Sequence, residues 1–122
     1  MSKNTDKQLL IDKIVEAIQD TKGEDIRIFD LSGIENSVAE TFIICSGNSN
    51  TQVSAIAGNI EKKVRNELKE RPWHVEGTEN AMWVLVDYVS VVVHIFQRQI
   101  REYYDIDDLW GDAKITTIEN TL

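Results

Sequence analysis

Two stretches of the chain carry apolar residues at helical spacing. The first predicts a helix over residues 6–22 that stops before Gly23, a residue type common just after helix ends. The second starts at Ser49, which stands three residues before Gln52 in the spacing of a capping box, and it ends at Pro72. The apolar stripes consist of Leu10, Ile11, Ile14, Val15 and Ile18 in the first helix and of Val53, Ile56, Ala57, Ile60, Val64 and Leu68 in the second. Each stripe predicts a helix face that is buried against a core.

Five short runs outside these helices have the patterns of strands. They are residues 25–31, 41–47, 73–77, 81–87 and 90–96. Residues 41–47 are almost wholly apolar, which suits a central strand buried on both faces. Residues 97–104 return to helical character, and residues 105–113 follow as a short helix or ordered arm. The predicted order is helix, strand, strand, helix, three strands and helix, which indicates an α/β fold.

The two strongest strands lie close together in the chain and predict an antiparallel hairpin. With Tyr88 and Val89 as its loop, Trp83 pairs with His94. Because side chains alternate along a strand, the hairpin has one aliphatic face and one mixed face. The aliphatic face holds Met82, Val84, Val86, Val91, Val93 and Ile95, and the mixed face holds Trp83, Leu85, Asp87, Val92, His94 and Phe96. The aliphatic face must lie on the core helices.

The mixed face admits two interpretations. In one, the C-terminal arm covers it, with Trp110 packed on Trp83. In the other, it is left open for a partner, since tryptophan is a frequent interface anchor. At the end of the chain, Leu109 and Trp110 are expected to tie the arm onto the domain, because an unanchored terminus would fray. Tyr103 is expected to pack within its helix, and Tyr104 is left at the rim with the neighbouring acids.

Composition narrows the range of functions. The chain has 122 residues and a formal charge of −8, which disfavours general binding to nucleic acid phosphates, including DNA. The charge suits a basic protein partner or serves solubility alone. The outer side of the second helix mixes both signs, which is typical of a solvated face. A single cysteine, no signal-peptide pattern and no apolar run long enough to span a membrane predict a cytoplasmic protein. We expect one domain over residues 1–113, frayed at its first residues, and a flexible tail over residues 114–122.

Catalytic and metal-binding motifs are weak. The six glycines form no phosphate-binding loop, and two histidines with one cysteine are too few for a zinc site. A nucleotidyltransferase would need paired carboxylates on a strand, and Asp87 stands alone at its strand end. Nucleophilic pairs of Cys45 or Ser46 with His94 stay open, although a structural role is the commoner one for such residues. We therefore predict neither a metal nor a cofactor.

Four blocks of the sequence, in order, resemble the ribosomal silencing factor family, also called Iojap-like proteins. They are "ETFIICSGNSNTQVSAIAGNIE", "VEGTENAMWVLVDY", "VVVHIF" and "REYYDIDDLWGDA". The resemblance implies a non-catalytic relative of the nucleotidyltransferase fold, with a mixed sheet that lacks the catalytic carboxylates. It also implies binding to the large ribosomal subunit through ribosomal protein L-fourteen, which blocks subunit joining and represses translation under nutrient limitation. Large-subunit assembly is the alternative role, a nucleotide-binding enzyme is a more distant one, and dimers are known in the family.

The resemblance also implies the residues that bind the partner. Matched position by position, they are Glu76, Gly77, Trp83, Asp87, His94, Tyr104, Leu109 and Trp110. The acids Asp105, Asp107 and Asp108 would then meet a basic ribosomal protein at the rim. Two positions depart from the family pattern. Val89 stands where the family has a turn glycine, and "ETF" at residues 40–42 replaces "DYF".

Overall fold

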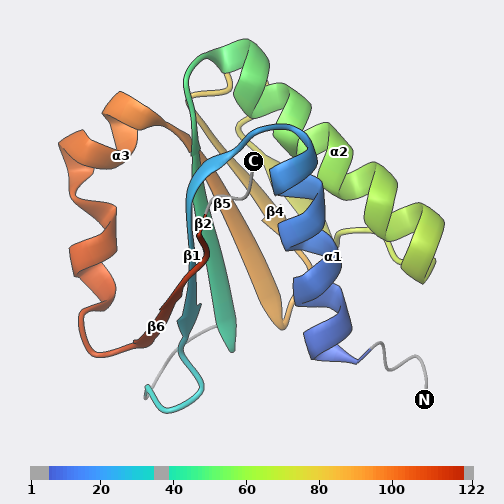
Figure 1. Cartoon of the computed structure of the whole chain (residues 1–122), viewed down its shortest axis with the longest axis horizontal. Helices are drawn as coiled ribbons and strands as arrows, with labels where there is room; N and C mark the ends of the chain where they lie inside the picture. The colour runs from blue at the N-terminus through green and yellow to red at the C-terminus, as the bar shows by residue number, and fades with distance from the viewer. Residues whose placement is uncertain (1–5, 35–38, 120–122) are drawn as a thin grey trace.

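The computed structural model describes residues 6–34 and 39–119, and the predictions for the first five and last three residues lie outside these ranges. Three α-helices, one 3-10 helix and six strands follow one another in the described ranges (Figure 1). The helices are α1 (Lys7–Asp20), α2 (Asn50–Leu68), α3 (Arg98–Tyr104) and η1 (Ile106–Trp110). The strands are β1 (Glu24–Asp30), β2 (Thr41–Gly47), β3 (His74–Glu76), β4 (Trp83–Asp87), β5 (Val91–Gln97) and β6 (Lys114–Thr117).

The strands form one mixed sheet in the order β3-β4-β5-β2-β1-β6. Its central pair, β2 and β5, runs parallel, and all other neighbours run antiparallel. Every residue of β2 is buried, in agreement with its continuous apolar run. The predicted single α/β fold with a mixed sheet is confirmed for the described residues.

Helical layers cover the two faces of the sheet to different extents. Helices α1 and α2 lie on one face and α3 with η1 on the other, as the ribbon shows (Figure 1). The α1–α2 layer packs its apolar stripes onto the aliphatic face of β4 and β5, where Val84, Val93 and Ile95 are fully buried. The second layer packs Ile106 and Trp110 over a smaller cluster around Phe29 and Phe96. The second face is therefore covered over β1 and β2 and more open towards β4.

The β4–β5 hairpin has the predicted faces and a different register. Trp83 pairs with Phe96 and Leu85 with His94, so the predicted pairing of Trp83 with His94 is wrong. The Tyr88 amide donates to the Val91 carbonyl, which makes Val89 and Ser90 the loop. Moving the loop by one residue shifts each partner by two, and a shift of two leaves every side chain on its predicted face.

Val89 holds the turn in a conformation that β-branched residues rarely adopt. Its φ is +77°, in the left-handed region that favours glycine. The carboxylate of Asp87 accepts a hydrogen bond from the Val89 amide at 2.7 Å, which offsets part of this strain. The Ser90 amide donates to the Tyr88 carbonyl across the same residue. A tight turn therefore forms without the expected glycine.

The end of the described chain corrects the predicted domain boundary. Residues 114–122 were expected to form a flexible tail, but Lys114–Thr117 form β6 and pair with β1. Ile118 packs against the larger core cluster, and its amide donates to the Ile26 carbonyl at 2.9 Å. The segment "KITTI" is rich in β-branched residues, a strand signal that its terminal position and polar neighbours obscured.

Candidate partner-binding face

Trp83 is a partly exposed aromatic residue at the start of β4. Its side chain is 42% exposed and its ring lies 4.8 Å from that of Phe96, between centroids. Its indole Nε1–H donates to Nδ1 of His94 at 3.1 Å. Packing and the hydrogen bond together hold the indole in one orientation, with a large apolar area facing solvent. Rigid, amphipathic rings of this kind are frequent hot spots of interfaces.

His94 lies behind Trp83 in a nearly dry environment and is only 9% exposed. Burial lowers the pKa of its ring to about 4, and the nearby carboxylate of Asp87 opposes that change. The ring is therefore neutral near pH 7. Because an indole N–H can only donate, Nδ1 of His94 is the acceptor and the ring proton sits on Nε2. Nε2 is buried and has no hydrogen-bond partner within the described residues.

Trp110 makes no ring contact with Trp83 among the described residues. Its ring packs edge-on against Phe42, with centroids 5.2 Å apart, so that it sits over β2. The rings that contact Trp83 among the described residues are those of His94 and Phe96, on β5. Phe42 also packs edge-on against His94 at 4.7 Å, which joins the two tryptophans through a continuous aromatic row. Phe42 and His94 in the middle of the row are buried, so its accessible rings are Trp83 at one end and, in part, Trp110 at the other. The absence of a ring contact between the two tryptophans favours the open-face interpretation at Trp83.

Glu76, Gly77 and Asp87 border this face near β3. Glu76 is exposed and pairs with His74, and Asp87 is half-buried at the end of β4. Gly77 has a φ of +87°, and a Cβ there would lie only 2.0 Å from the Trp83 carbonyl oxygen. Gly77 therefore lets the β3–β4 connection pass close to the backbone that carries Trp83. In the structure, Gly77 serves to let two backbone segments pass close to each other.

The C-terminal arm is anchored differently from the prediction. Leu109 was expected to tie it down but is 66% exposed, while Ile106 is the buried apolar residue. Tyr103 was expected to pack within its helix but is exposed, in edge-on contact with Tyr104, which is also exposed. A five-residue 3-10 helix has too few turns to bury a complete apolar stripe. Leu109 consequently leaves exposed apolar area in η1 beside Trp110 in the chain, and Tyr104 leaves more at the end of α3.

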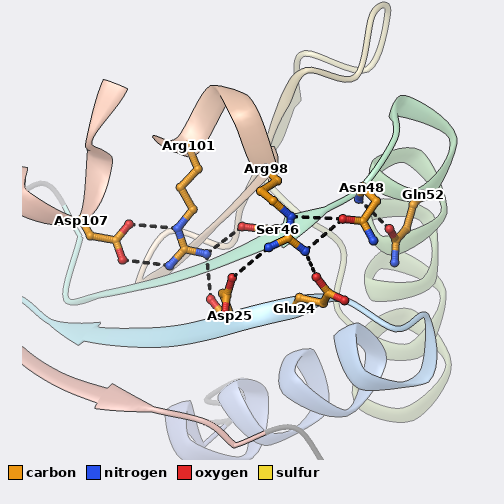
Figure 2. Close-up of polar contacts among 8 residues, drawn as sticks. All are labelled: Glu24, Asp25, Ser46, Asn48, Gln52, Arg98, Arg101 and Asp107. Carbon is orange, nitrogen blue, oxygen red and sulfur yellow. Dashed lines mark hydrogen bonds and ion pairs between the residues drawn. The ribbon is translucent and has the colours of Figure 1, made fainter. Parts of the chain in front are cut away.

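A buried arginine at the base of the arm was missed by sequence reasoning. Arg101 of α3 is 8% exposed and forms a bidentate pair with the carboxylate of Asp107, at 2.9 and 2.8 Å (Figure 2). Asp107, expected among the rim acids, instead points inward. A detectable signal was present, because an arginine on a short helix is followed six residues later by an acid in "REYYDID". Nothing in the spacing alone showed that the pair would be buried.

A second arginine in the same region ties the turn before α2 to β1. Arg98 contacts the side-chain carbonyl of Asn48 at 3.0 Å and pairs with Glu24 (Figure 2). One half of the predicted capping box is present, since the Ser49 hydroxyl accepts a hydrogen bond from the backbone N–H of Gln52 at 3.1 Å. The return bond of the Gln52 side chain goes to residue 48, one position before the N-cap, where it accepts from the Asn48 amide at 2.7 Å. These contacts fix the Ser-Gly-Asn turn within the protein.

This region offers little to a nucleotide. The hollow of about 380 Å³ beside Ser46 is lined by three arginines and five acids, and acids disfavour phosphates. Among residues 6–34 and 39–119, no group of three or more metal-ligating side chains is placed to hold an ion. Burial raises the pKa of the Cys45 thiol to about 12, so it stays protonated. Cys45 also lies on the opposite sheet face from His94, because the neighbour of His94 across the ladder is Ile44.

No helix in the described part of the chain is both long and apolar enough to cross a bilayer.

Comparisons with known proteins agree on one family. The family model described as "Ribosomal silencing factor during starvation" matches residues 3–122. The ribosomal silencing factor of Halalkalibacterium halodurans is 41% identical over 115 residues, which cover 94% of this chain and 97% of that protein. The Bacillus subtilis factor is 42% identical over 104 residues, which cover 84% and 86%. A crystal structure of a Chromobacterium violaceum protein superposes with a TM-score of 0.82 at 36% identity, covering 96% of this chain and 97% of that one.

Proposed function

The chain belongs to the ribosomal silencing factor family, and from this premise we propose that it binds the large ribosomal subunit and blocks its joining to the small subunit. The family is non-enzymatic, so the function rests on a surface and not on a reaction. The observation that carries the proposal is the indole of Trp83, which His94 and Phe96 hold in place and which is 42% exposed at one end of the aromatic row that reaches Trp110. Occupation of the subunit-joining surface would repress translation when nutrients are short.

The partner on the large subunit is ribosomal protein L-fourteen, a basic protein. Acids border the aromatic row on both sides, with Glu76 near Trp83 and Asp108 near Trp110, and both are exposed. The whole chain carries a formal charge of −8. Such charges speed the encounter with a basic partner and exclude wrong ones, while the buried aromatic centre supplies most of the affinity.

The chemistry of the contact follows from the ring positions. Trp83 offers an apolar face whose only polar atom is already satisfied by His94, so burying it against a partner leaves no indole N–H unpaired. A neutral His94 adds no charge to be desolvated. The face therefore suits an apolar or aliphatic contact at its centre and basic side chains at its rim.

Truncation of Trp83 tests this assignment. Trp83→Ala removes the central anchor and should weaken co-sedimentation with purified large subunits by about 30-fold, equivalent to about 2 kcal/mol. Trp73→Ala is the matched control, because Trp73 is also an exposed tryptophan, at 76%. Its backbone amide donates to the carbonyl of Asp87, so it lies at the end of β4 away from Trp83. Trp73→Ala should bind as the parent does. The same pair of variants is then compared for inhibition of subunit joining.

The outcomes separate cleanly. A parent protein that fails to co-sediment with large subunits at moderate salt would contradict the proposed function as a whole. Parent-like binding by Trp83→Ala, or equal losses in both variants, would contradict the assignment of the face. Urea denaturation of each variant confirms that it is folded at the assay temperature, and Trp83→Phe, which keeps an aromatic ring, should recover part of the binding.

A further inference from the structure

The guanidinium of Arg101 joins three elements that are distant in the chain. Besides its bidentate pair with Asp107 in η1, its Nη1 donates to the Ser46 hydroxyl at 2.9 Å at the end of β2. The same Nη1 donates to the Asp25 carbonyl at 2.7 Å in β1 (Figure 2). A guanidinium has five N–H donors in a fixed plane. Here Nε and Nη2 donate to Asp107, and Nη1 donates to both Asp25 and Ser46.

The backbone of β1 is shaped to meet this arginine. The register between β1 and β2 shifts between Glu24 and Arg27, which marks a bulge. Within the bulge Asp25 has a φ of +51°, uncommon for a residue other than glycine. The carbonyl that the bulge frees from the regular ladder accepts the hydrogen bond from Arg101. A strained backbone position is thus matched to a buried charge.

Asp107 is held from two sides. Arg27 of β1 reaches the carboxylate oxygen Oδ2 of Asp107 at 3.0 Å, in addition to the pair with Arg101. The hydrogen bond from Arg101 is the main reason why the pKa of Asp107 lies below its ordinary value. The carboxylate is therefore ionised near pH 7, and it balances the buried guanidinium.

Between α3 and β6, which pairs with β1, the arm has few other contacts that hold it. Ile106 is its buried apolar residue, and Trp110 is half-buried on Phe42. A left-handed residue, Asp105, separates η1 from α3 with a φ of +50°. The hydrogen bond and the charge of Asp108 raise the pKa of the Asp105 carboxyl. Removing the carboxylate of Asp107 would leave the middle of the arm without its ion pairs to Arg101 and Arg27.

We propose that Arg101, acting through Asp107, is the positioning residue that sets the C-terminal arm so that Leu109 and Trp110 extend the Trp83 face. This inference rests on the proposed ribosome-binding function and names the part of the molecule that prepares the surface for it. Neither Arg101 nor Asp107 needs to touch the partner. Both act on affinity by fixing where Leu109 stands before binding, since a preorganised surface loses less entropy on association.

A double-mutant cycle in subunit binding tests the inference. Asp107→Asn keeps the shape of the side chain and weakens the pair with Arg101, and it should lower affinity for large subunits about tenfold. If it acts by displacing the arm, it should cost clearly less in a Leu109→Ala background, where part of the displaced contact is already missing. In a Trp83→Ala background its cost should be close to its full value, because Trp83 is held by other residues. Coupling to Leu109 and additivity with Trp83 is the expected pattern.

The control variant is Glu24→Gln. It makes the same acid-to-amide change in the same region, on the partner of Arg98, which contacts no residue of η1 among the described ones. It should bind as the parent does. Equal losses for Glu24→Gln and Asp107→Asn would indicate general destabilisation and would overturn the proposal, as would parent-like binding of Asp107→Asn or additivity with Leu109→Ala.

A second measurement needs no ribosome. Protein labelled with fluorotryptophan gives one fluorine resonance for each of Trp73, Trp83 and Trp110. Asp107→Asn should shift or broaden the Trp110 resonance and leave the other two in place. An unchanged Trp110 resonance would overturn the positioning role even if the protein binds subunits. Conversely, Asp107→Asn could shift the Trp110 resonance although the parent protein does not bind subunits. That result would support the positioning role of Arg101 and Asp107 and contradict only the proposed function.

Discussion

His94 shows how a single buried residue links the binding face to stability. The imidazole supports Trp83 from below and has its pKa lowered from 6.5 to about 4 by burial. The unfolded chain therefore binds a proton more readily than the folded one between these two values. Folding stability contributed by this site is fully present above about pH 6.5 and is lost as the pH falls towards 4.

This pH dependence is measurable. Urea unfolding of the parent between pH 7.5 and pH 4.5 should show a decline to which His94 contributes up to about 3 kcal/mol. His94→Gln keeps a hydrogen-bond acceptor for the Trp83 indole but cannot titrate, so the decline should be smaller by that amount. Carboxylates with a lowered pKa, such as that of Asp107, contribute less to folding stability as the pH falls further. They do so in both proteins, so their contribution cancels in the difference between the two curves. Parallel curves for the two proteins would contradict the buried, neutral state of His94.

Single residues also mark where sequence reasoning succeeds and fails. The position of Trp83 on the mixed face, with Leu85, His94 and Phe96, followed from strand alternation, which has a fixed period of two. The inward turn of Asp107 did not follow, because an acid among acids looks solvated until its distant arginine partner is known. Leu109 was misassigned for a related reason, since an apolar residue in a short 3-10 helix can face either way. Of the predicted contact residues, Trp83, His94 and Trp110 lie together in the aromatic row, and their role in binding stays a prediction.

At the scale of elements, periodic segments were predictable and the chain end was not. Helices α1 and α2 begin and end within two residues of the predicted bounds, except at the C-terminal end of α2. Their apolar stripes are long, which makes such helices predictable from the sequence. The hairpin kept its faces but changed its register, because Val89 adopts a φ that sequence rules assign to glycine. Strand β6 was missed because it has four residues, all exposed, and its identity depends on a partner strand almost ninety positions earlier in the chain.

The pairing of β6 with β1 predicts a contrast between two neighbouring prolines. The Ile118 amide donates to the Ile26 carbonyl, so by antiparallel alternation the Thr116 amide faces β1 while the Thr117 amide faces away. Thr116→Pro removes a ladder hydrogen bond and should lower the free energy of unfolding by about 2 kcal/mol. Thr117→Pro should cost clearly less. Denaturation curves and amide exchange of β1 measure both, and identical behaviour of the two variants would contradict the strand.

At the scale of the whole molecule, the proposed binding function assigns different roles to charge and to aromatic area. Charge should affect the rate of association, and aromatic area should affect how long the complex lasts. The formal charge of −8 acts over distance and is screened by salt, while the aromatic row acts only in contact. A domain of this kind can meet a basic protein quickly without depending on charge to stay bound. The two properties can be measured separately.

Association with purified L-fourteen should therefore depend on salt through its on-rate. We expect the on-rate to fall about tenfold as ionic strength rises from roughly 0.05 to 0.5 M, with a smaller change in the off-rate. Combining Glu76→Gln with Asp108→Asn should flatten the salt dependence, whereas Trp83→Ala should raise the off-rate and leave the salt slope unchanged. Stopped-flow binding distinguishes the two. An on-rate insensitive to salt would show that the acids do not steer the encounter.

The contacts of Arg101 and Asp107 that join the arm to the sheet also affect the order in which the chain can fold. Asp25 and Arg101 are 76 positions apart and Arg27 and Asp107 are 80 apart, so these contacts close very large loops. Contacts of such sequence separation form late, because the entropy of loop closure must be offset first. Synthesis proceeds from the N-terminus, so α1, β1, β2 and α2 can assemble before the arm exists. A chain still in synthesis therefore lacks the contacts of Arg101 with Asp107, and the arm can take its place against the sheet only after η1 has been made.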